Sequence, residues 1–394
     1  MRFSDVYRGK TVLVTGHTGF KGSWLSEWLS MLGARVVGYS LRPDRESDPC
    51  FTSPSHFLEL GLREELAGHI EGDVGNLSEL EAALADHDPD FLFHLAAQPL
   101  VLRGYEDPYG TFQTNVVGSL NLLEALRRRG KACVAVMITT DKVYENLGWV
   151  HSYREPDALG GSDPYSASKA CAELVVSSYA RSFFGAAAAG PARGAIAVAS
   201  VRGGNVIGGG DWAENRIVPD AMRALAAGRP VPIRNRHATR PWQHVLEPLG
   251  GYLLLGSQMA RRRQDLLAAR EEGPGARSAL DAVCTSFNFG PLLPSNRPVA
   301  ALVEEIFKSW PGRSEDRSTA GAPREAGRLN LTIDKAFHLL GWQPRWGFEE
   351  TVAHTVDWYR RFYASARGDT DKVRALTRGQ IEAYSEGLAA GADG

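Results

Sequence analysis

Along the first half of the chain, short apolar runs rich in β-branched residues alternate with longer stretches whose apolar positions recur every three or four residues. Runs of the first kind are typical of buried strands, and stretches of the second kind are typical of amphipathic helices. The predicted strands cover residues 11–15, 35–39, 69–73, 91–95, 134–138 and 195–201, and the predicted helices cover 24–32, 77–85, 111–129 and 165–184. Because near-continuous apolar strands separated by helices favour a parallel sheet covered on both faces, the predicted fold class is α/β with a doubly wound sheet.

The pattern changes at about residue 204, where Gly and Pro interrupt short helical segments. We therefore predict a first domain at 1–203 and a smaller, mostly helical lobe at 204–368, some segments of which return to the first domain. Residues 369–394 form a polar tail with scattered Ala and Gly, and we expect a loosely packed helix or a frayed end there.

Composition excludes several classes of partner. The chain has 394 residues, 43% of them hydrophobic and 23% charged, and a formal net charge of -2. Since there is no basic excess, we expect neither nucleic acid nor anionic membranes as partners, which leaves small molecules and further copies of the chain. The four cysteines have no CxxC spacing or interleaved His, so neither a metal site nor a disulfide framework is expected. Without a signal-peptide pattern or a membrane-length apolar run, a cytoplasmic protein is expected.

Residues 16–22, Gly-His-Thr-Gly-Phe-Lys-Gly, join the first predicted strand to a helix. Glycines in such a loop permit a tight turn and let backbone N–H groups and the helix N-terminus face a pyrophosphate. Because the flanking strand and helix are those that the motif requires, a Rossmann-type dinucleotide site is favoured over a flexible surface turn. The loop residues expected to contact the cofactor are Gly16, Thr18, Gly19, Phe20, Lys21 and Gly22.

The end of the second predicted strand bears on the type of dinucleotide. A site that prefers NAD usually has Asp or Glu there, whereas this chain has Ser40, with Arg42 two residues on. A hydroxyl and a guanidinium could accept the 2′-phosphate of NADP, and Lys21 adds another cation. These residues alone leave NAD and NADP both open.

Ligands of parallel sheets bind beyond the carboxyl ends of the strands. Chemistry is therefore expected at Gly16, Asp73, Ala96, Thr139 to Lys142 and Arg202 to Asn205, with Val74, Leu95 and Ala97 as further cofactor contacts. For Asp73 and Asn205, capping of a loop is an equally good interpretation.

Tyr165 and Lys169 are spaced i, i+4 within a predicted helix, so their side chains share one face. An ammonium beside a phenol favours the phenolate, and the pair is therefore interpreted as an acid/base centre that also contacts the cofactor. The same spacing occurs by accident on solvated helices.

Thr140, Asp141 and Lys142 follow the strand that leads toward Tyr165. Oxidation of an alcohol needs only Tyr165 and a nicotinamide, so a further acid and base indicate that a second bond breaks, for instance by loss of water. The alternative is an Asp-Lys turn pair in water.

The predicted helices at 111–129 and 165–184 carry apolar residues beyond one narrow stripe. Such helices suit a bundle between subunits, which would give a homodimer or possibly a tetramer, although burial within one subunit is the alternative.

Seven sequence blocks carry a family resemblance: GHTGFKGSWL at 16–25, HLAAQPLV at 94–101, TFQTNVVGS at 111–119, TDKVYEN at 140–146, DPYSASK at 163–169, GNVIGGGDWAENR at 204–216 and HATRPWQHVLEPL at 237–249. With them the chain, from about residue 9 to about 363, resembles the extended short-chain dehydrogenase/reductase family and, within it, the branch of CDP-glucose 4,6-dehydratases.

The resemblance implies an NAD-dependent hydro-lyase that oxidises C4 of the sugar, loses water across C5 and C6, and returns hydride to C6. It implies Tyr165, Lys169 and Thr140 as the residues acting at O4, Asp141 as the acid and Lys142 as a candidate base. The better-known dTDP-glucose dehydratases have Asp-Glu where this chain has Asp141-Lys142, so Lys142 is a base only if its pKa is lowered. Substrate contacts are expected from Gln98, Asn205, Arg216, Arg234 and Arg240. A 4-epimerase or ketoreductase, or a non-catalytic dinucleotide sensor, are the alternative functions.

Overall fold

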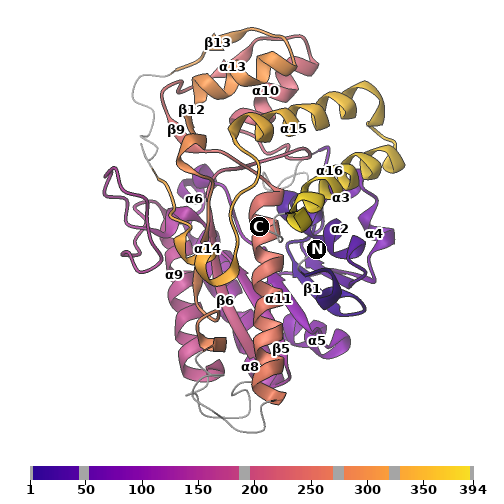
Figure 1. Ribbon diagram of the computed structural model, residues 1–394, viewed down its shortest axis with the longest axis vertical. Coiled ribbons are helices and arrows are strands. Elements are labelled where there is room, and N and C mark those ends of the chain that lie inside the picture. Colours follow the sequence, from indigo (N-terminus) through magenta and orange to yellow (C-terminus); the bar gives the residue numbers. More distant parts are fainter. Residues whose placement is uncertain (1–2, 44–52, 186–195, 269–278, 319–328, 391–394) are drawn as a thin grey trace.

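Seven parallel strands form the centre of the protein in a computed structural model that describes residues 3–43, 53–185, 196–268, 279–318 and 329–390 (Figure 1). The sheet has the order β11-β6-β5-β4-β1-β2-β3, and every pairing within it is parallel. Its strands are β1 (Thr11–Thr15), β2 (Arg35–Ser40), β3 (Gly68–Glu71), β4 (Phe91–His94), β5 (Cys133–Ile138), β6 (Ile196–Gly203) and β11 (Ser286–Phe289). The predicted doubly wound parallel sheet is confirmed, with β11 added at one edge.

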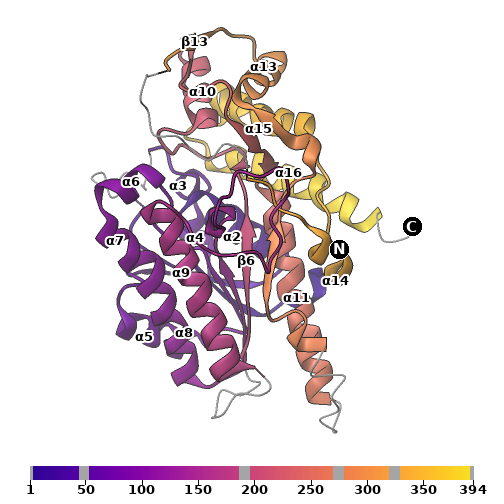
Figure 2. The same ribbon diagram turned by 90° about the vertical axis from the view of Figure 1, so that its left-hand side faces the viewer.

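Helices cover both faces of this sheet (Figure 2). One face carries α5 (Leu77–His87), α8 (Gly118–Arg129) and α9 (Pro164–Tyr179), and the other carries α2 (Phe20–Met31) and α11 (Leu246–Ala268). Successive residues of β1 point to opposite faces of the sheet. Val12 and Val14 belong to the core beneath α2 and α11, while Leu13 belongs to the core beneath α5 and α8. Helices therefore cover both faces of the sheet, although the residues of the edge strand β3 are only partly buried.

The two long predicted helices form, and each contains a π-helical turn. The first consists of α7 (Pro108–Phe112), η1 (Gln113–Val117) and α8, and the second of α9 followed by η3 (Ala180–Phe184). At the start of α9, the Asp163 carboxylate accepts a hydrogen bond from the Ser166 N–H at 3.0 Å, and Pro164 occupies the first turn. This cap fixes Tyr165 in the first turn of α9, at the carboxyl edge of the sheet.

A second lobe of helices and two-stranded sheets lies above the carboxyl edge of the large sheet (Figure 1). Its main elements are α10 (Ile217–Ala226), α13 (Val299–Ser309), α15 (Phe348–Arg361), the parallel pairs β7 (Val206–Ile207) with β10 (Gln243–His244) and β8 (Val231–Ile233) with β13 (Ser314–Asp316), and the antiparallel pair β9 (Thr239–Pro241) with β12 (Asn296–Pro298). Shorter helical elements are α1 (Ser4–Tyr7), α3 (His56–Glu59), α4 (Leu62–Glu65), α6 (Val101–Glu106), η2 (Asp141–Val143), η4 (Leu293–Ser295), α14 (Asp334–Leu340) and η5 (Phe362–Ala366). Across the described ranges, no helix is long and apolar enough to span a membrane.

The C-terminal segment returns to the first lobe as α16 (Thr370–Ala390), which packs against α2 and α3. Val373, Ile381 and Tyr384 are fully buried, and Arg378 pairs with the buried Glu27 of α2. The expectation of a loosely packed or frayed tail is therefore wrong for these residues; residues 391–394 lie outside the described part. The buried positions recur at helical spacing, but they form a stripe too narrow to stand out among the polar residues.

Candidate active site

The glycine loop after β1 leaves no room for side chains. Gly16 has a φ of +74°, and a Cβ added to it would lie 2.6 Å from the backbone nitrogen of Ala96. At Gly22 an added Cβ would lie 2.1 Å from the Gly16 carbonyl oxygen, whereas at Gly19 the same oxygen is 3.4 Å away. Because α2 begins at Phe20, directly after this bare turn, its free N–H groups face the space where a pyrophosphate would lie. The residues present therefore fit a dinucleotide.

The end of β2 provides the expected hydroxyls. Ser40 and Thr18 are buried and their hydroxyl oxygens are 2.8 Å apart. Arg42 is exposed, and its Nε lies 3.8 Å from a carboxylate oxygen of Glu71, so its charge is partly balanced. The Arg42 guanidinium thus has an acidic partner within the protein and does not require the 2′-phosphate of NADP as one.

Other predicted cofactor residues line the neighbouring strand ends. The Asp73 side chain accepts a hydrogen bond from the Gly75 N–H at 2.8 Å, which is the loop-capping role left open for it. Val74 is buried against Gly118. Leu95, Ala96 and Ala97 follow β4 and are half-buried, with the Ala96 N–H donating to the Thr15 hydroxyl at 3.3 Å.

Lys21 lies among the catalytic candidates, a position that differs from the sequence-based grouping with Ser40 and Arg42. The pKa of Lys21 is lowered to about 8, first by burial and then by the charge of Arg216, while the charges of Asp141 and Asp211 oppose this shift. Of these electrostatic neighbours, Asp141 follows β5, and Asp211 and Arg216 lie in the loop before α10. Side-chain direction from the first turn of α2, which sequence spacing does not give, decides this placement.

Tyr165 and Lys169 both lie on the predicted helix, four residues apart in α9, and both are buried. Burial lowers the pKa of Lys169 to about 8, and its ammonium donates a hydrogen bond to the Ile138 carbonyl at 3.2 Å. Burial also raises the pKa of Tyr165 to about 12, against the opposing effects of a hydrogen bond with Thr140 and the charge of Arg216. Desolvation thus outweighs the cations around the phenol, so these residues alone do not lower the pKa of Tyr165 as the spacing led us to expect.

Thr140 and Asp141 form the centre of the site, in the turn η2 that follows β5. The Thr140 hydroxyl donates to Asp141 Oδ1 at 2.9 Å. Asp141 is 3% exposed, and its Oδ2 has no hydrogen-bond partner within the described residues. At Gly204 an added Cβ would lie 3.2 Å from that oxygen, so the backbone of the next strand end closes over it. A buried carboxyl oxygen left open in this way is available to a ligand.

Burial acts on Asp141 and Lys142 in opposite senses. It raises the pKa of Asp141, although Lys142, Thr140, Arg240 and Lys21 all oppose this. It lowers the pKa of Lys142, with Asp141 opposing and Arg240 assisting. Desolvation thus favours a neutral acid beside a neutral amine, and the alternative of a turn pair in water does not apply.

The structure separates the five predicted substrate residues. Arg216 pairs with Asp211 at 3.1 Å and influences Tyr165, while Arg240 influences Asp141, so both belong to the catalytic cluster. Arg234 instead lies on the second lobe, paired with Asp220.

Gln98 and Asn205 have internal partners. The Gln98 amide donates to the Thr111 hydroxyl at 2.8 Å and accepts from the Leu100 N–H at 2.6 Å, which holds the loop after β4. The Asn205 carbonyl accepts from the Gln243 N–H at 3.1 Å. Their contacts to a substrate remain predictions.

Two features beneath the site were missed from the sequence. Glu173 of α9 and Arg202 of β6 form a fully buried ion pair at 3.0 Å. Tyr252 of α11 is buried with its hydroxyl unpaired among the described residues, and Tyr165 is among the charges that raise its pKa. Arg202 was recognised as a strand-end residue, but its helix partner is 29 residues earlier and gave no local signal.

Comparison with known proteins agrees with this arrangement. The model of the NAD dependent epimerase/dehydratase family matches residues 12–264. The CDP-glucose 4,6-dehydratase of Salmonella typhimurium is 41% identical over 385 residues, covering 95% of this chain and 99% of that protein. A dTDP-glucose 4,6-dehydratase of Xanthomonas campestris is 28% identical, covering 93% and 98%.

Solved structures share the fold at lower identity. A dTDP-glucose 4,6-dehydratase of Bacillus anthracis in complex with NAD has a TM-score of 0.67 and 19% identity, covering 93% of this chain and 100% of that one. Epimerase Mth375 of Methanothermobacter thermautotrophicus has a TM-score of 0.70 and 22% identity, covering 93% and 97%. Together, the family model and the near full-length relative show that this chain belongs to the NAD-dependent epimerase/dehydratase family.

Proposed function

We propose that the protein is a nucleotide-sugar 4,6-dehydratase that converts CDP-D-glucose into CDP-4-keto-6-deoxy-D-glucose. The observation that carries this is Asp141, a buried carboxyl with a raised pKa and one unpartnered oxygen, beside the Thr140 and Tyr165 hydroxyls. An epimerase or ketoreductase needs Tyr165 but has no use for such an acid. The 41% identity to a CDP-glucose 4,6-dehydratase supports the same substrate.

Oxidation at C4 comes first. The Thr140 hydroxyl orients the sugar 4-hydroxyl, and Tyr165 acts as a phenolate that accepts the proton of that hydroxyl, with the positive charges of Lys169 and Arg216 stabilising the phenolate before the transfer. The glycine loop, together with Thr18 and Ser40, would hold NAD, which would supply the hydride acceptor for C4 and the hydride donor for C6. The 4-keto group acidifies the C5 proton.

Elimination then uses Asp141 as the acid and Lys142 as the base. Lys142 accepts the C5 proton as an amine, and Asp141 gives its proton to the departing 6-hydroxyl through the open Oδ2, so that water leaves and a C5–C6 double bond forms. Addition of hydride at C6 and of the proton at C5 completes the product. No net oxidation or reduction takes place over a full turnover.

Incubation with CDP-glucose tests the proposal directly. We expect a 4-keto-6-deoxy product by NMR, no net consumption of NAD, and solvent deuterium at C5 in heavy water. Unchanged CDP-glucose at high enzyme concentration, or product without deuterium at C5, would contradict it.

We also propose that two chains assemble through the helices at 111–129 and 165–184. Phe112 of α7 and Leu174 of α9 are 36% and 60% exposed, and Tyr105 and Tyr109 nearby are 58% and 74% exposed. Large apolar side chains left in water on adjoining helices support an interface there. Light scattering of the wild type and of Leu174→Glu tests this, because a dimer built on this face dissociates in the variant.

A further inference from the structure

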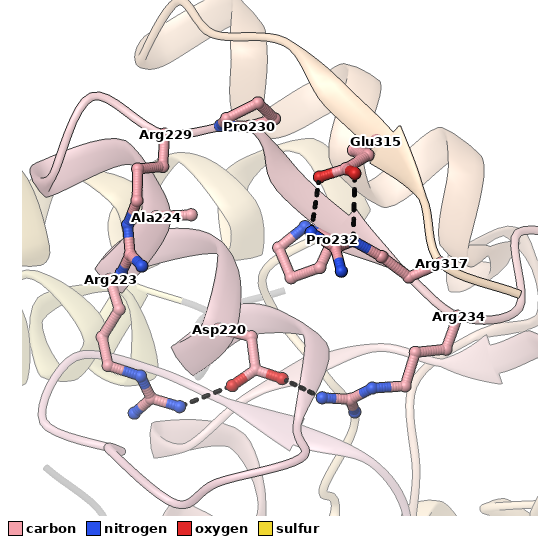
Figure 3. Close-up of a pocket in the computed structure, with 9 residues that line it drawn as sticks. All are labelled: Asp220, Arg223, Ala224, Arg229, Pro230, Pro232, Arg234, Glu315 and Arg317. Atoms are coloured by element: carbon pink, nitrogen blue, oxygen red, sulfur yellow. Dashed lines mark hydrogen bonds and ion pairs between the residues drawn. The ribbon is translucent and has the colours of Figure 1, made fainter.

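A separate pocket lies on the second lobe between α10, β8 and β13, with a volume of about 320 Å³ (Figure 3). Its lining consists of Asp220, Arg223, Ala224, Arg229, Pro230, Pro232, Arg234, Glu315 and Arg317. Four arginines face two acids, which leaves the pocket positively charged. Pro230 and Pro232 add flat apolar surface, so the pocket combines a surface for stacking with groups for hydrogen bonding.

Asp220 is held rigidly on one side of this pocket. Arg223 Nη2 contacts one carboxylate oxygen at 2.5 Å, and Arg223 Nη1 donates to the Trp212 carbonyl at 2.7 Å. Arg234 Nη2 contacts the other oxygen at 2.9 Å. Figure 3 shows Asp220 between the guanidinium groups of Arg223 and Arg234. The Asp220 and Arg234 side chains are 13% and 51% exposed, so the pair presents one polar edge to an incoming ligand.

Helix α10 links the pocket to the catalytic cluster. The Asp220 N–H donates to the Arg216 carbonyl at 3.0 Å, which places the two residues one turn apart, about 6 Å along the helix. Arg216 in turn influences Tyr165 and Lys142. A substrate whose diphosphate binds Arg216 while its sugar lies at Tyr165 therefore points its nucleoside toward Asp220.

We propose that the Asp220–Arg234 pair reads the base of the substrate and selects cytosine. The inference rests on the proposed function and adds to it the residues that set the nucleotide specificity. Side by side, a carboxylate oxygen and two guanidinium N–H groups present acceptor, donor and donor, the same order as the pairing edge of guanine. Cytosine is complementary, since its N4 amino group donates to a carboxylate and its N3 and O2 accept from a guanidinium.

Uracil and thymine mismatch this edge twice. Their O4 faces the carboxylate, acceptor against acceptor, and their N3–H faces the guanidinium, donor against donor. Sites that hydrogen-bond a polar group discriminate strongly against analogues that leave buried partners unpaired. Arg229 and Arg317, by contrast, attract every nucleotide through charge alone.

The test compares CDP-glucose with UDP-glucose, which differ only in the base edge. For the wild type we expect kcat/KM to favour CDP-glucose by about a hundredfold. In Asp220→Asn combined with Arg234→Gln, both amides can donate or accept, so the ratio should fall by about tenfold or more. Because the ratio is taken within one protein sample, partial misfolding of the variant cancels.

Inhibition by free CDP and UDP gives a second readout that does not depend on turnover, and their ratio of inhibition constants should fall in parallel. Arg317→Gln is the matched control, since it removes one pocket charge away from Asp220 and should leave both ratios within about twofold of wild type. Equal ratios in the double variant and the wild type, or an equally large change in Arg317→Gln, would overturn the base-reading role while leaving the dehydratase proposal intact. Failure of the wild type to convert CDP-glucose would instead overturn the proposed function itself.

Discussion

Two carboxyl groups, Asp141 and Glu173, are each 3% exposed, yet their surroundings give them opposite properties. Glu173 accepts from the Thr139 and Ser200 hydroxyls and from two nitrogens of Arg202. Burial alone would raise the pKa of Glu173, but these partners hold that pKa below its ordinary value. Asp141 has one hydroxyl partner, and burial raises its pKa. Depth in the protein therefore does not distinguish a structural carboxylate from a reactive acid; the number and charge of its partners do.

Glu247 of α11 provides an intermediate case. It accepts backbone hydrogen bonds from Arg345 at 3.0 Å and Trp346 at 2.7 Å, and the Tyr384 hydroxyl donates to it at 2.8 Å. Burial nevertheless raises its pKa to about 7. The oxygens of Glu247 thus have hydrogen-bond donors, but these donors are neutral. They stabilise the negative charge of Glu247 less than the buried guanidinium of Arg202 stabilises that of Glu173.

Replacement of Asp141 by Asn should give the largest effect on activity. A general acid accelerates a reaction by about 10²- to 10⁴-fold, so the rate of CDP-glucose dehydration should fall by that factor. NMR of the product measures this rate. Oxidation at C4 does not need this carboxyl, so reduced nicotinamide should accumulate and be visible by absorbance. Loss of that signal together with dehydration would show that Asp141 acts in oxidation instead.

Replacement of Glu173 by Ala should act on stability rather than chemistry. Removal of one partner leaves Arg202 buried and unpaired, which should lower the free energy of unfolding by about 3–5 kcal/mol, measured by urea denaturation. Adding Arg202→Met should recover much of that loss, because an apolar pair has no charge to desolvate. A drop in kcat of the folded fraction comparable to that of Asp141→Asn would contradict the distinction between the two sites.

Glu247 should make the stability of the protein depend on pH. Its folded pKa is raised, so its contribution is fully present below the ordinary value of 4.5 and is lost as pH rises through about 7. The rise corresponds to about 3 kcal/mol, and Glu247→Gln should remove that slope from the melting temperature measured between pH 4.5 and 8. An unchanged slope in the variant would assign the pH dependence to other groups.

The smallest expected effect lies in the shape of the pH–rate profile. The rate should fall about tenfold per pH unit on either side of its optimum, because elimination needs Asp141 protonated and Lys142 neutral at the same time. Because burial lowers the pKa of Lys142 and raises that of Asp141, the two limbs lie closer together than the ordinary values would place them. Lys142→Arg, which stays protonated, should abolish the acid limb; if the limb persists, another group removes the C5 proton.

Much of the fold could be predicted because its signals are local. Apolar runs marked six strands of the large sheet, whereas β11, with Ser and Asn alternating with Phe over four residues, was too short and mixed to stand out. The catalytic strand end was also predictable, since Thr140 and Asp141 follow directly after a buried strand.

Partners distant in sequence were not predictable. Glu173 is an ordinary helix residue until β6 brings Arg202 beside it, and Arg234 resembles other surface arginines until α10 brings Asp220 within 2.9 Å. The raised pKa of Tyr165 could not be predicted either, because spacing indicates a nearby cation but not the degree of desolvation. Neither the contacts between distant residues nor the electrostatic balance that they set could therefore be predicted.

The position of α16 has a consequence for how the protein is made. Its Arg378 pairs with Glu27, a fully buried residue of the helix that follows the glycine loop. Chains generally fold from the N-terminus during synthesis, yet here one of the first helices made is covered by the last. The packing around α2 is therefore completed only after α16 has been made.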